Sequence, residues 1–128
     1  MMNRKPVHVK ILLALMVLSV SGVACADGNA SAGEKLFTQC SACHAVGPEA
    51  QNSVGPVLNG VVGRPAGKYP GYRYSSAMRR SGLVWDEATL IKYLRGPDKV
   101  VPGTKMAFAG IEADQDLADL VAYLKQQH

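Results

Sequence analysis

The sequence predicts a small all-α domain in which a large share of the chain is loop. Apolar residues recur at intervals of three, four and seven between residues 112 and 127, which is the period of a helix with one buried face. Residues 86–95 show a shorter pattern of the same kind. Residues 44–73 are rich in glycine and proline and show no sustained period, so they predict loop.

The N-terminus has the composition of a secretory signal. A basic start precedes an apolar run over residues 11–20, and small residues up to Ala26 offer a cleavage site. The run is shorter than the roughly 18 to 20 apolar residues that span a bilayer. An uncleaved anchor and a lipid on Cys25 are the alternatives. We expect a cleaved signal peptide over residues 1–26, export to the periplasm, one domain over residues 27–128 and no membrane span after cleavage.

The charge of the mature domain is close to zero. The whole chain has 14 Lys and Arg against 10 Asp and Glu, a formal net charge of +4. Loss of Arg4, Lys5 and Lys10 with the signal leaves 11 cations against the same 10 acids, or +1. This surplus gives no support for nucleic-acid binding, which needs a strongly basic surface.

A first helix is expected over residues 32–39, and a cysteine motif follows it directly. Residues 40–44 read Cys-Ser-Ala-Cys-His, the spacing of a c-type haem attachment. Two thiols on one turn, Cys40 and Cys43, can each form a thioether to a haem vinyl group. The adjacent His44 is then held beneath the iron as its proximal ligand.

Three other uses of a Cys-x-x-Cys pair compete with haem. A thioredoxin-like dithiol is expected to follow a strand, whereas this pair follows a predicted helix. A zinc site needs two more ligands, but the mature chain has no other cysteine and its only other histidine is His128. A plain disulfide is the third alternative. The following histidine and the predicted export favour haem.

With no second internal histidine, the second iron ligand would be a thioether, an amine or a tyrosine, and the candidates are the methionines outside the signal, Met78 and Met106. Met106 follows a proline and a glycine at 102–103, which predict a loop that can carry the sulfur to iron. Met78 falls in a short helix expected over residues 74–78. Either methionine could instead fill a gap in the core.

The two later helices have clear ends. Asp86 is a capping residue at the start of the helix over residues 86–95, and Gly96 with Pro97 ends it. In the helix over residues 112–127, acidic residues gather toward the start, which suits the helix dipole. The buried faces are expected to comprise Leu90, Ile91 and Leu94 in the first helix and Leu117, Leu120, Val121 and Leu124 in the second.

Together these motifs resemble class I cytochrome c of the mitochondrial and photosynthetic-bacterial type over nearly all of the mature length. The matching segments, in order, are residues 33–37, 40–44, 55–58, 63–64, 71–75, Trp85, 93–94, 102–106 and 122–124. The resemblance implies crossed N- and C-terminal helices, with Phe37 packed against Leu120 and Tyr123, and loops wrapped around one covalent haem c. It also implies that Met106 is the axial ligand.

The resemblance assigns roles to further residues. The carbonyl of Pro56 would accept a hydrogen bond from the proximal imidazole and fix its orientation. Tyr93 and Thr104 would lie beside the methionine sulfur, and Met78 stands where the family commonly has asparagine. Donors to the haem propionates would come from Arg64, Tyr74, Ser75 and Trp85. Taken singly, each of these residues also has an ordinary structural explanation.

The implied function is that of a soluble, monomeric single-electron carrier and not an enzyme. The expected partners are a quinol-oxidising cytochrome bc type complex as donor and a terminal oxidase or photosynthetic reaction centre as acceptor. The rival is a haem enzyme or a sensor of peroxide or gas with a labile sixth ligand. Five cations are hypothesised to surround the haem edge and steer acidic partners: Lys68, Arg79, Arg80, Lys99 and Lys105.

Overall fold

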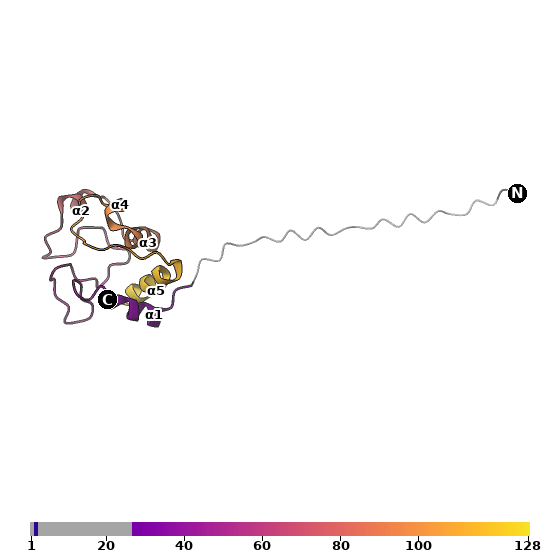
Figure 1. Cartoon of the computed structure of the whole chain (residues 1–128), viewed down its shortest axis with the longest axis horizontal. Helices are drawn as coiled ribbons and strands as arrows, with labels where there is room; N and C mark the ends of the chain where they lie inside the picture. Colours follow the sequence, from indigo (N-terminus) through magenta and orange to yellow (C-terminus); the bar gives the residue numbers. More distant parts are fainter. Residues whose placement is uncertain (1, 3–26) are drawn as a thin grey trace.

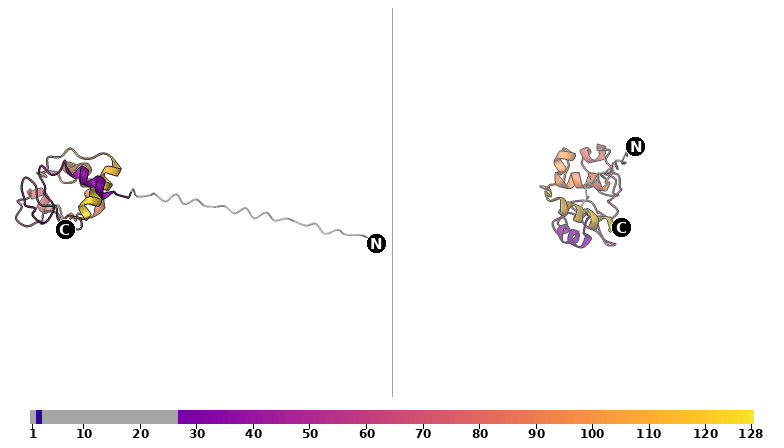
Figure 2. Two further views of the ribbon diagram at one scale, coloured as in Figure 1. Left: turned by 90° about the horizontal axis from the view of Figure 1, so that it is seen from below. Right: turned by 90° about the vertical axis from the view of Figure 1, so that its right-hand side faces the viewer.

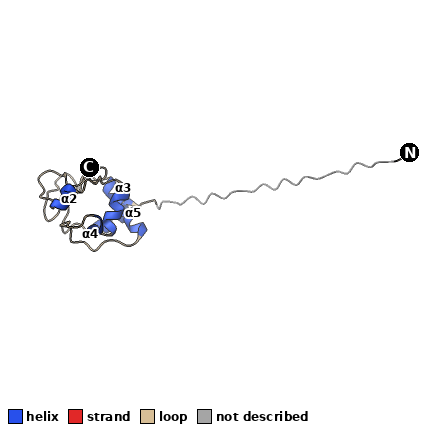
Figure 3. Cartoon of the chain, turned by 90° about the horizontal axis from the view of Figure 1, so that it is seen from above, coloured by secondary structure: helices blue, strands red, loops and turns tan. Residues whose placement is uncertain are grey.

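The computed structural model describes Met2 and residues 27–128, so the predicted signal peptide otherwise lies outside the described residues. Residues 27–128 form five helices, and the only strand-like pairing among them is a single bridge between Pro65 and Val84 (Figures 1 and 3). The helices are α1 (Ala30–Phe37), α2 (Ser76–Arg80), α3 (Glu87–Arg95), α4 (Pro97–Val100) and α5 (Asp114–Lys125). The predicted all-α class is confirmed.

The helix boundaries differ from the prediction at several places, and α2 lies two residues later than the expected 74–78 because Ser75 caps it. Helix α1 begins two residues earlier than expected because the Asn29 side chain caps it, accepting a hydrogen bond from the Ala32 amide at 3.1 Å. The C-terminal helix is shorter at both ends than residues 112–127. Helix α4 was not predicted: Gly96 is extended, with φ of −170°, and Pro97 starts a new short helix.

The first and last helices pack closely against each other (Figures 1 and 2). A methyl group added at Gly33 would lie 2.0 Å from the carbonyl oxygen of Asp119, so only glycine allows this approach. The Phe37 ring lies 5.4 Å from the Tyr123 ring, and Leu120 belongs to the same core. The predicted pairing of the first and last helices and the contact of Phe37 with Tyr123 are therefore confirmed.

The interior faces of α3 and α5 follow the predicted pattern with one change. All four residues predicted to be inward on α5 are buried, and Leu117 has no exposed surface. On α3, Leu90 and Leu94 are buried, whereas Ile91 is only partly buried and Tyr93 is buried in addition. Tyr93 takes this position because its ring packs on Trp85, with ring centroids 4.8 Å apart.

A buried carboxylate joins the chain before α1 to α5. Asp119 is 6% exposed and accepts hydrogen bonds from the Asn29 amide at 2.7 Å and from the Gln115 side chain at 2.8 Å. The Gln115 amide also contacts the carbonyl oxygen of Asp27 at 3.0 Å. The first residues of the predicted mature domain are thus held on the C-terminal helix.

The loop half of the molecule, residues 44–75, is joined by side chains that bond to distant backbone. Asn52 accepts from the Val57 amide at 2.9 Å and donates to the Pro70 carbonyl at 3.0 Å. The Tyr72 hydroxyl donates to the Val54 carbonyl at 2.7 Å. These bonds replace the regular ladders that helices or sheets would supply.

Within the part of the chain that the structure describes, no helix has the length and apolar character required to cross a bilayer. The helices instead form one wall of a cavity that the loops close.

Candidate haem site

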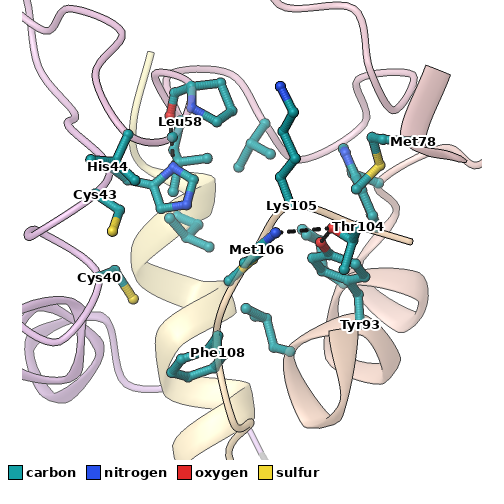
Figure 4. Close-up of a pocket in the computed structure, with 18 of the residues that line it drawn as sticks. Cys40, Cys43, His44, Leu58, Met78, Tyr93, Thr104, Lys105, Met106 and Phe108 are labelled. Atoms are coloured by element: carbon teal, nitrogen blue, oxygen red, sulfur yellow. Dashed lines mark hydrogen bonds between the residues drawn. The ribbon is translucent and has the colours of Figure 1, made fainter. Parts of the chain in front are cut away.

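One cavity of about 220 Å³ lies between the helical half and the loop half. Figure 4 shows Cys40, Cys43 and His44 on one side of it and Met106, Thr104 and Tyr93 on the other. All eleven residues predicted for the site line this cavity: Cys40, Cys43, His44, Pro56, Arg64, Tyr74, Ser75, Trp85, Tyr93, Thr104 and Met106. The structure therefore brings together residues that are spread over more than 60 positions of the sequence.

The cysteine motif forms a helical turn that continues from α1. The amides of Cys43 and His44 both donate to the Cys40 carbonyl, at 3.0 and 2.9 Å. This turn places both thiols, which are free and partly buried, beside the His44 ring at the cavity wall. Burial, with a smaller contribution from Cys43, raises the pKa of the Cys40 thiol above its ordinary value.

The His44 ring is held by the backbone of the next loop. Its Nδ1 lies 2.7 Å from the Pro56 carbonyl oxygen, and a carbonyl can only accept, so Nδ1 carries the proton. The lone pair of Nε2 is then free to bind a metal. Burial lowers the pKa of His44, and the bond to Pro56 partly offsets this effect. The imidazole is therefore favoured in its neutral, ligating form.

Gly55 leaves room for this ring. A methyl group at Gly55 would lie 2.5 Å from His44 Cε1, and the Gly55 amide donates to the Cys43 carbonyl at 2.8 Å. The imidazole consequently lies flat against backbone that carries no side chain.

Met106 reaches the cavity from a tight turn. The Thr104 amide donates to the Val101 carbonyl at 3.0 Å, and Gly103 has φ of +89°, a conformation that favours glycine. Lys105 then fixes the loop from outside, since its Nζ donates to the Arg73 carbonyl at 2.6 Å. The break predicted at residues 102–103 thus delivers the thioether to the cavity.

Two hydroxyl groups lie beside Met106. The Tyr93 hydroxyl and the Thr104 hydroxyl are 2.8 Å apart, and Thr104 Oγ1 also accepts from the Met106 amide at 3.3 Å. Burial raises the pKa of Tyr93 above its ordinary value, with a smaller opposing effect from the bond to Thr104. Tyr93 is therefore a neutral donor over the physiological range.

Three of the four predicted propionate donors, Arg64, Tyr74 and Ser75, belong to the loop half, and their polar groups are not equally free. Arg64 donates to the carbonyls of Asn59 and Val57 at 2.8 and 3.3 Å and stacks over the Tyr69 ring at 4.9 Å. Burial lowers its pKa, but the group stays charged. Ser75 already accepts from the Met78 amide as the cap of α2, so its hydroxyl hydrogen is free for another acceptor. Tyr74 and Trp85 complete this group.

Several residues that shape the cavity were not predicted. Leu58 and Phe108 line it with apolar surface, and Asn52 and Tyr72 tie its loops together. Phe108 lies two positions after Met106 on the same loop, so its place in the sequence was an available signal. The bonds of Asn52 and Tyr72 join residues 18 positions apart and have no local signature.

These residues fit a flat apolar group bound through two thioethers. Apart from the predicted donors, the lining is mostly aliphatic and aromatic, and the thiols share one wall with a neutral imidazole. The backbone at Gly55 contacts the ring so closely that a side chain there would clash with it. A thioether faces the imidazole across the cavity. This donor set suits a haem iron and gives no oxygen-rich site for a hard cation.

The comparisons with known proteins agree with this site. The family model for cytochrome c matches residues 30–128. The chain is 53% identical over 120 residues to cytochrome c2 of Rhodomicrobium vannielii, which covers 94% of this chain and 96% of the relative. Cytochrome c2 of Blastochloris viridis is 46% identical over 117 residues, covering 91% of this chain and 92% of the relative.

A solved structure is similar in fold as well. Cytochrome cH from Methylobacterium extorquens superposes with a TM-score of 0.73 at 50% identity, covering 77% of this chain and 98% of that one. The class I cytochrome c fold is thus confirmed, and with it one covalent haem c at the motif that holds Cys40 and Cys43. The chain belongs to the cytochrome c family, and it is an electron-transfer protein and not an enzyme.

Proposed function

We propose that the chain is an exported, diffusible carrier of single electrons whose haem iron is held between His44 and Met106. The single observation that carries this proposal is the arrangement of one neutral imidazole and one thioether on opposite sides of the same apolar cavity. The bound haem supplies a one-electron iron centre. The chain has to keep the coordination of that centre the same in both oxidation states.

Contacts within the chain itself hold both proposed ligands in place. His44 is fixed by the Pro56 carbonyl and by the flat surface of Gly55. Met106 is fixed by Thr104 and by the bond from Lys105 to Arg73. Ligands held on both sides need little rearrangement when an electron arrives or leaves, which favours rapid transfer.

The other lining residues set the environment of the iron. A neutral sulfur ligand and an apolar lining disfavour the additional charge of the ferric state, so they raise the reduction potential. We assign Arg64, Tyr74, Ser75 and Trp85 as donors to the haem carboxylates, since all four line the cavity and bear N–H or O–H donors. We assign Tyr93 and Thr104 to the side of the cavity that carries Met106.

The partners and the compartment follow from the relatives. Two of the relatives compared above are named cytochrome c2 and are bacterial. We propose that residues 1–26 are a cleaved signal, that the mature domain works in the periplasm, and that it takes electrons from a quinol-oxidising cytochrome bc type complex. The acceptor is a terminal oxidase or a photosynthetic reaction centre.

The ligation is tested with the haem-loaded protein and two methionine variants. Met106→Ala is expected to abolish the weak near-infrared band from sulfur to ferric iron. It should also lower the reduction potential by on the order of 100 mV, because axial ligands set haem potentials over about 0.8 V. Absorption spectra and a redox titration measure both effects.

Met78→Leu is the matched control, because Met78 is the other methionine that lines the cavity. It should keep the band, since Met78 is not assigned as a ligand. A Met106→Ala protein that retains the band, or a Met78→Leu protein that loses it, would overturn the assignment.

A further inference from the structure

One asparagine of residues 27–128 is followed by glycine, at Asn59 and Gly60. The backbone amide of a following residue can attack the carbonyl carbon of an asparagine side chain, and glycine hinders this attack least because it has no Cβ. The other two asparagines of residues 27–128, Asn29 and Asn52, precede alanine and serine. The sequence therefore makes Asn59 the asparagine most prone to lose its side-chain amide.

This reaction consumes only water. The Gly60 nitrogen forms a bond to Asn59 Cγ, and the side-chain nitrogen leaves as ammonia with the proton that the Gly60 amide gives up. Water then opens the five-membered imide at either of its two carbonyl carbons. The product is an aspartate at position 59, or an isoaspartate whose main chain passes through the former side chain and is one carbon longer.

In the folded protein, hydrogen bonds hold both reacting groups apart. Asn59 Oδ1 accepts from the Gly47 amide and Asn59 Nδ2 donates to the Gly47 carbonyl, both at 2.8 Å. The Gly60 amide, which is the nucleophile, donates to the Gln127 carbonyl at 2.8 Å. Three hydrogen bonds must therefore break before the attack, even though Gly60 itself is exposed to water.

The bond to the nucleophile comes from the segment just after α5. The Gln127 side chain holds this segment, since its Nε2 donates to the Tyr123 carbonyl at 3.1 Å. The Gln127 amide also donates to the Leu124 carbonyl at 3.1 Å. Helix ends fray more readily than helix interiors. Fraying at this end of α5 consequently releases the Gly60 amide.

We propose that Asn59 is a deamidation site, which the bonds from Gly47 and Gln127 keep closed and which opens when the segment after α5 detaches. The site is built from the loop half and from the last helix, so its reactivity reports whether the two halves are joined. The deamidation does not depend on the iron ligands or on electron transfer.

The modification reaches the haem cavity through Arg64. Arg64 lines the cavity, and its Nη1 donates to the Asn59 carbonyl at 2.8 Å. Either product adds a negative charge to the residue that holds this guanidinium, and isoaspartate also lengthens the main chain there. Negative charge near the haem stabilises the ferric state, so deamidation lowers the reduction potential. This consequence rests on the proposed function, in which Arg64 is a donor to the haem carboxylates.

The site is tested by incubating the folded, haem-loaded protein and the guanidinium-denatured chain at mildly alkaline pH. Mass spectrometry follows the peptide that contains Asn59. In the denatured chain, Asn59 should react faster than Asn29 and Asn52. In the folded protein it should react more slowly by on the order of a hundredfold, because three hydrogen bonds of about 1 kcal/mol each must break. The change of mass distinguishes this reaction from isomerisation at Asp27, which leaves the mass unchanged.

Gln127→Ala tests the control by the last helix without altering the reacting residues. It keeps the Gln127 carbonyl but removes the side-chain bond to Tyr123, so deamidation should be about fivefold faster, the equivalent of one hydrogen bond. Hydrogen exchange of the Gly60 amide should accelerate by the same factor, while amides inside α5 should not change. Gln126→Ala, at the exposed neighbouring position, is the matched control and should change both rates less than about twofold.

The link to Arg64 is tested on deamidated protein separated by anion exchange. Its equilibrium with a one-electron mediator should lie about fivefold further toward the ferric form, in line with one added charge. Ser31→Asp adds the same charge at an exposed position of α1 and should shift the equilibrium less than about twofold.

Each other outcome overturns a named part of the inference. Equal rates in the folded and denatured chains would show that the three bonds do not protect Asn59. Equal effects of the two glutamine variants would exclude control by the segment after α5. Equal shifts in deamidated protein and in Ser31→Asp would exclude the link to Arg64. Loss of the near-infrared band in unmodified protein would instead reject the proposed iron ligation and would leave the rates of deamidation unexplained by it.

Discussion

The helical half and the loop half of this domain are held together by different forces. Helices α1, α3 and α5 bury a continuous apolar face, with Leu117 and Leu120 almost fully enclosed. Residues 44–75 form no helix and bury only three apolar side chains, those of Val57, Val61 and Ala66, and individual hydrogen bonds from side chains to backbone link their loops. Apolar burial is distributed over many atoms, whereas each polar bond of the loop half is one contact of about 1 kcal/mol.

The two halves therefore contribute differently to the haem site. The helical half supplies a wall whose shape is set by packing alone, and it carries Tyr93 at the cavity. The loop half carries Pro56 and most of the predicted donors, and individual hydrogen bonds link its segments. We therefore expect disturbances of the helical half to act on global stability, and disturbances of the loop half to act first on the haem environment.

The largest effect is expected where the helical half has no spare room. Gly33→Ala places a methyl group 2.0 Å from the Asp119 carbonyl oxygen, so α1 and α5 must separate. We expect a loss of about 3 kcal/mol in the free energy of unfolding, near the upper end for overpacking. The thermal midpoint should fall by roughly 10 to 20 °C.

Calorimetry of the haem-loaded protein measures this change, and Ser31→Ala on the exposed side of the same helix is the control. The control should stay within about 0.5 kcal/mol. If Gly33→Ala were equally mild, close packing would not distinguish the two halves.

A smaller effect is expected from Asn52, which bonds to two separate segments of the loop half. Asn52→Ala removes the bonds to the Val57 amide and the Pro70 carbonyl, which should cost about 2 kcal/mol. Because these bonds hold the loop and not the helices, the near-infrared haem band should be lost at a lower guanidinium concentration than the helical circular dichroism. Gln51→Ala, at the exposed neighbouring position, should leave the two transitions coincident. Coincident transitions in Asn52→Ala would show that the halves unfold as one unit.

The smallest effect is expected at the boundary between the halves and depends on pH. At neutral pH, Tyr93→Phe removes one hydrogen bond to Thr104 and should cost about 1 kcal/mol. Burial raises the pKa of Tyr93 in the folded protein above its ordinary value of 10.0. The unfolded protein therefore loses its proton first as pH rises, and stability is lost from about pH 10 through the folded pKa.

The phenylalanine variant lacks this particular loss, so the gap between the two proteins should narrow as the pH increases. Denaturant unfolding at neutral pH and at about pH 11 measures the gap. The other tyrosines are present in both proteins and do not affect the difference. A gap that stays constant would show that Tyr93 ionises equally well in both states.

How far the sequence could predict the structure also differs between the halves. The period of apolar residues in α5 and the capping Asp86 of α3 are local signals, and both helices lie where they were expected. Helix α4 was missed because Gly96 followed by Pro97 signals an end and a start equally well. The docking of Asn29 on Asp119 joins positions 90 residues apart, which no local pattern encodes.

The residues of the site also differ in how far the sequence predicts them. The motif of Cys40, Cys43 and His44 is explicit because its chemistry fixes its spacing. The residues alone narrowed the second iron ligand to two methionines, Met78 and Met106, and the resemblance to class I cytochrome c favoured Met106. Asn52 and Tyr72 escaped prediction since their bonds depend on how two loops meet in space.

The carbonyl of Pro56 has a consequence for how this domain can be studied. The oxygen that orients His44 belongs to the main chain, and every amino acid placed at position 56 would bring the same oxygen. A systematic alanine or saturation screen would therefore rate this position by its ring alone and would pass over the group that matters. Replacing an amide by an ester through chemical synthesis alters the backbone itself, and it is the kind of editing by which the contribution of this oxygen becomes measurable.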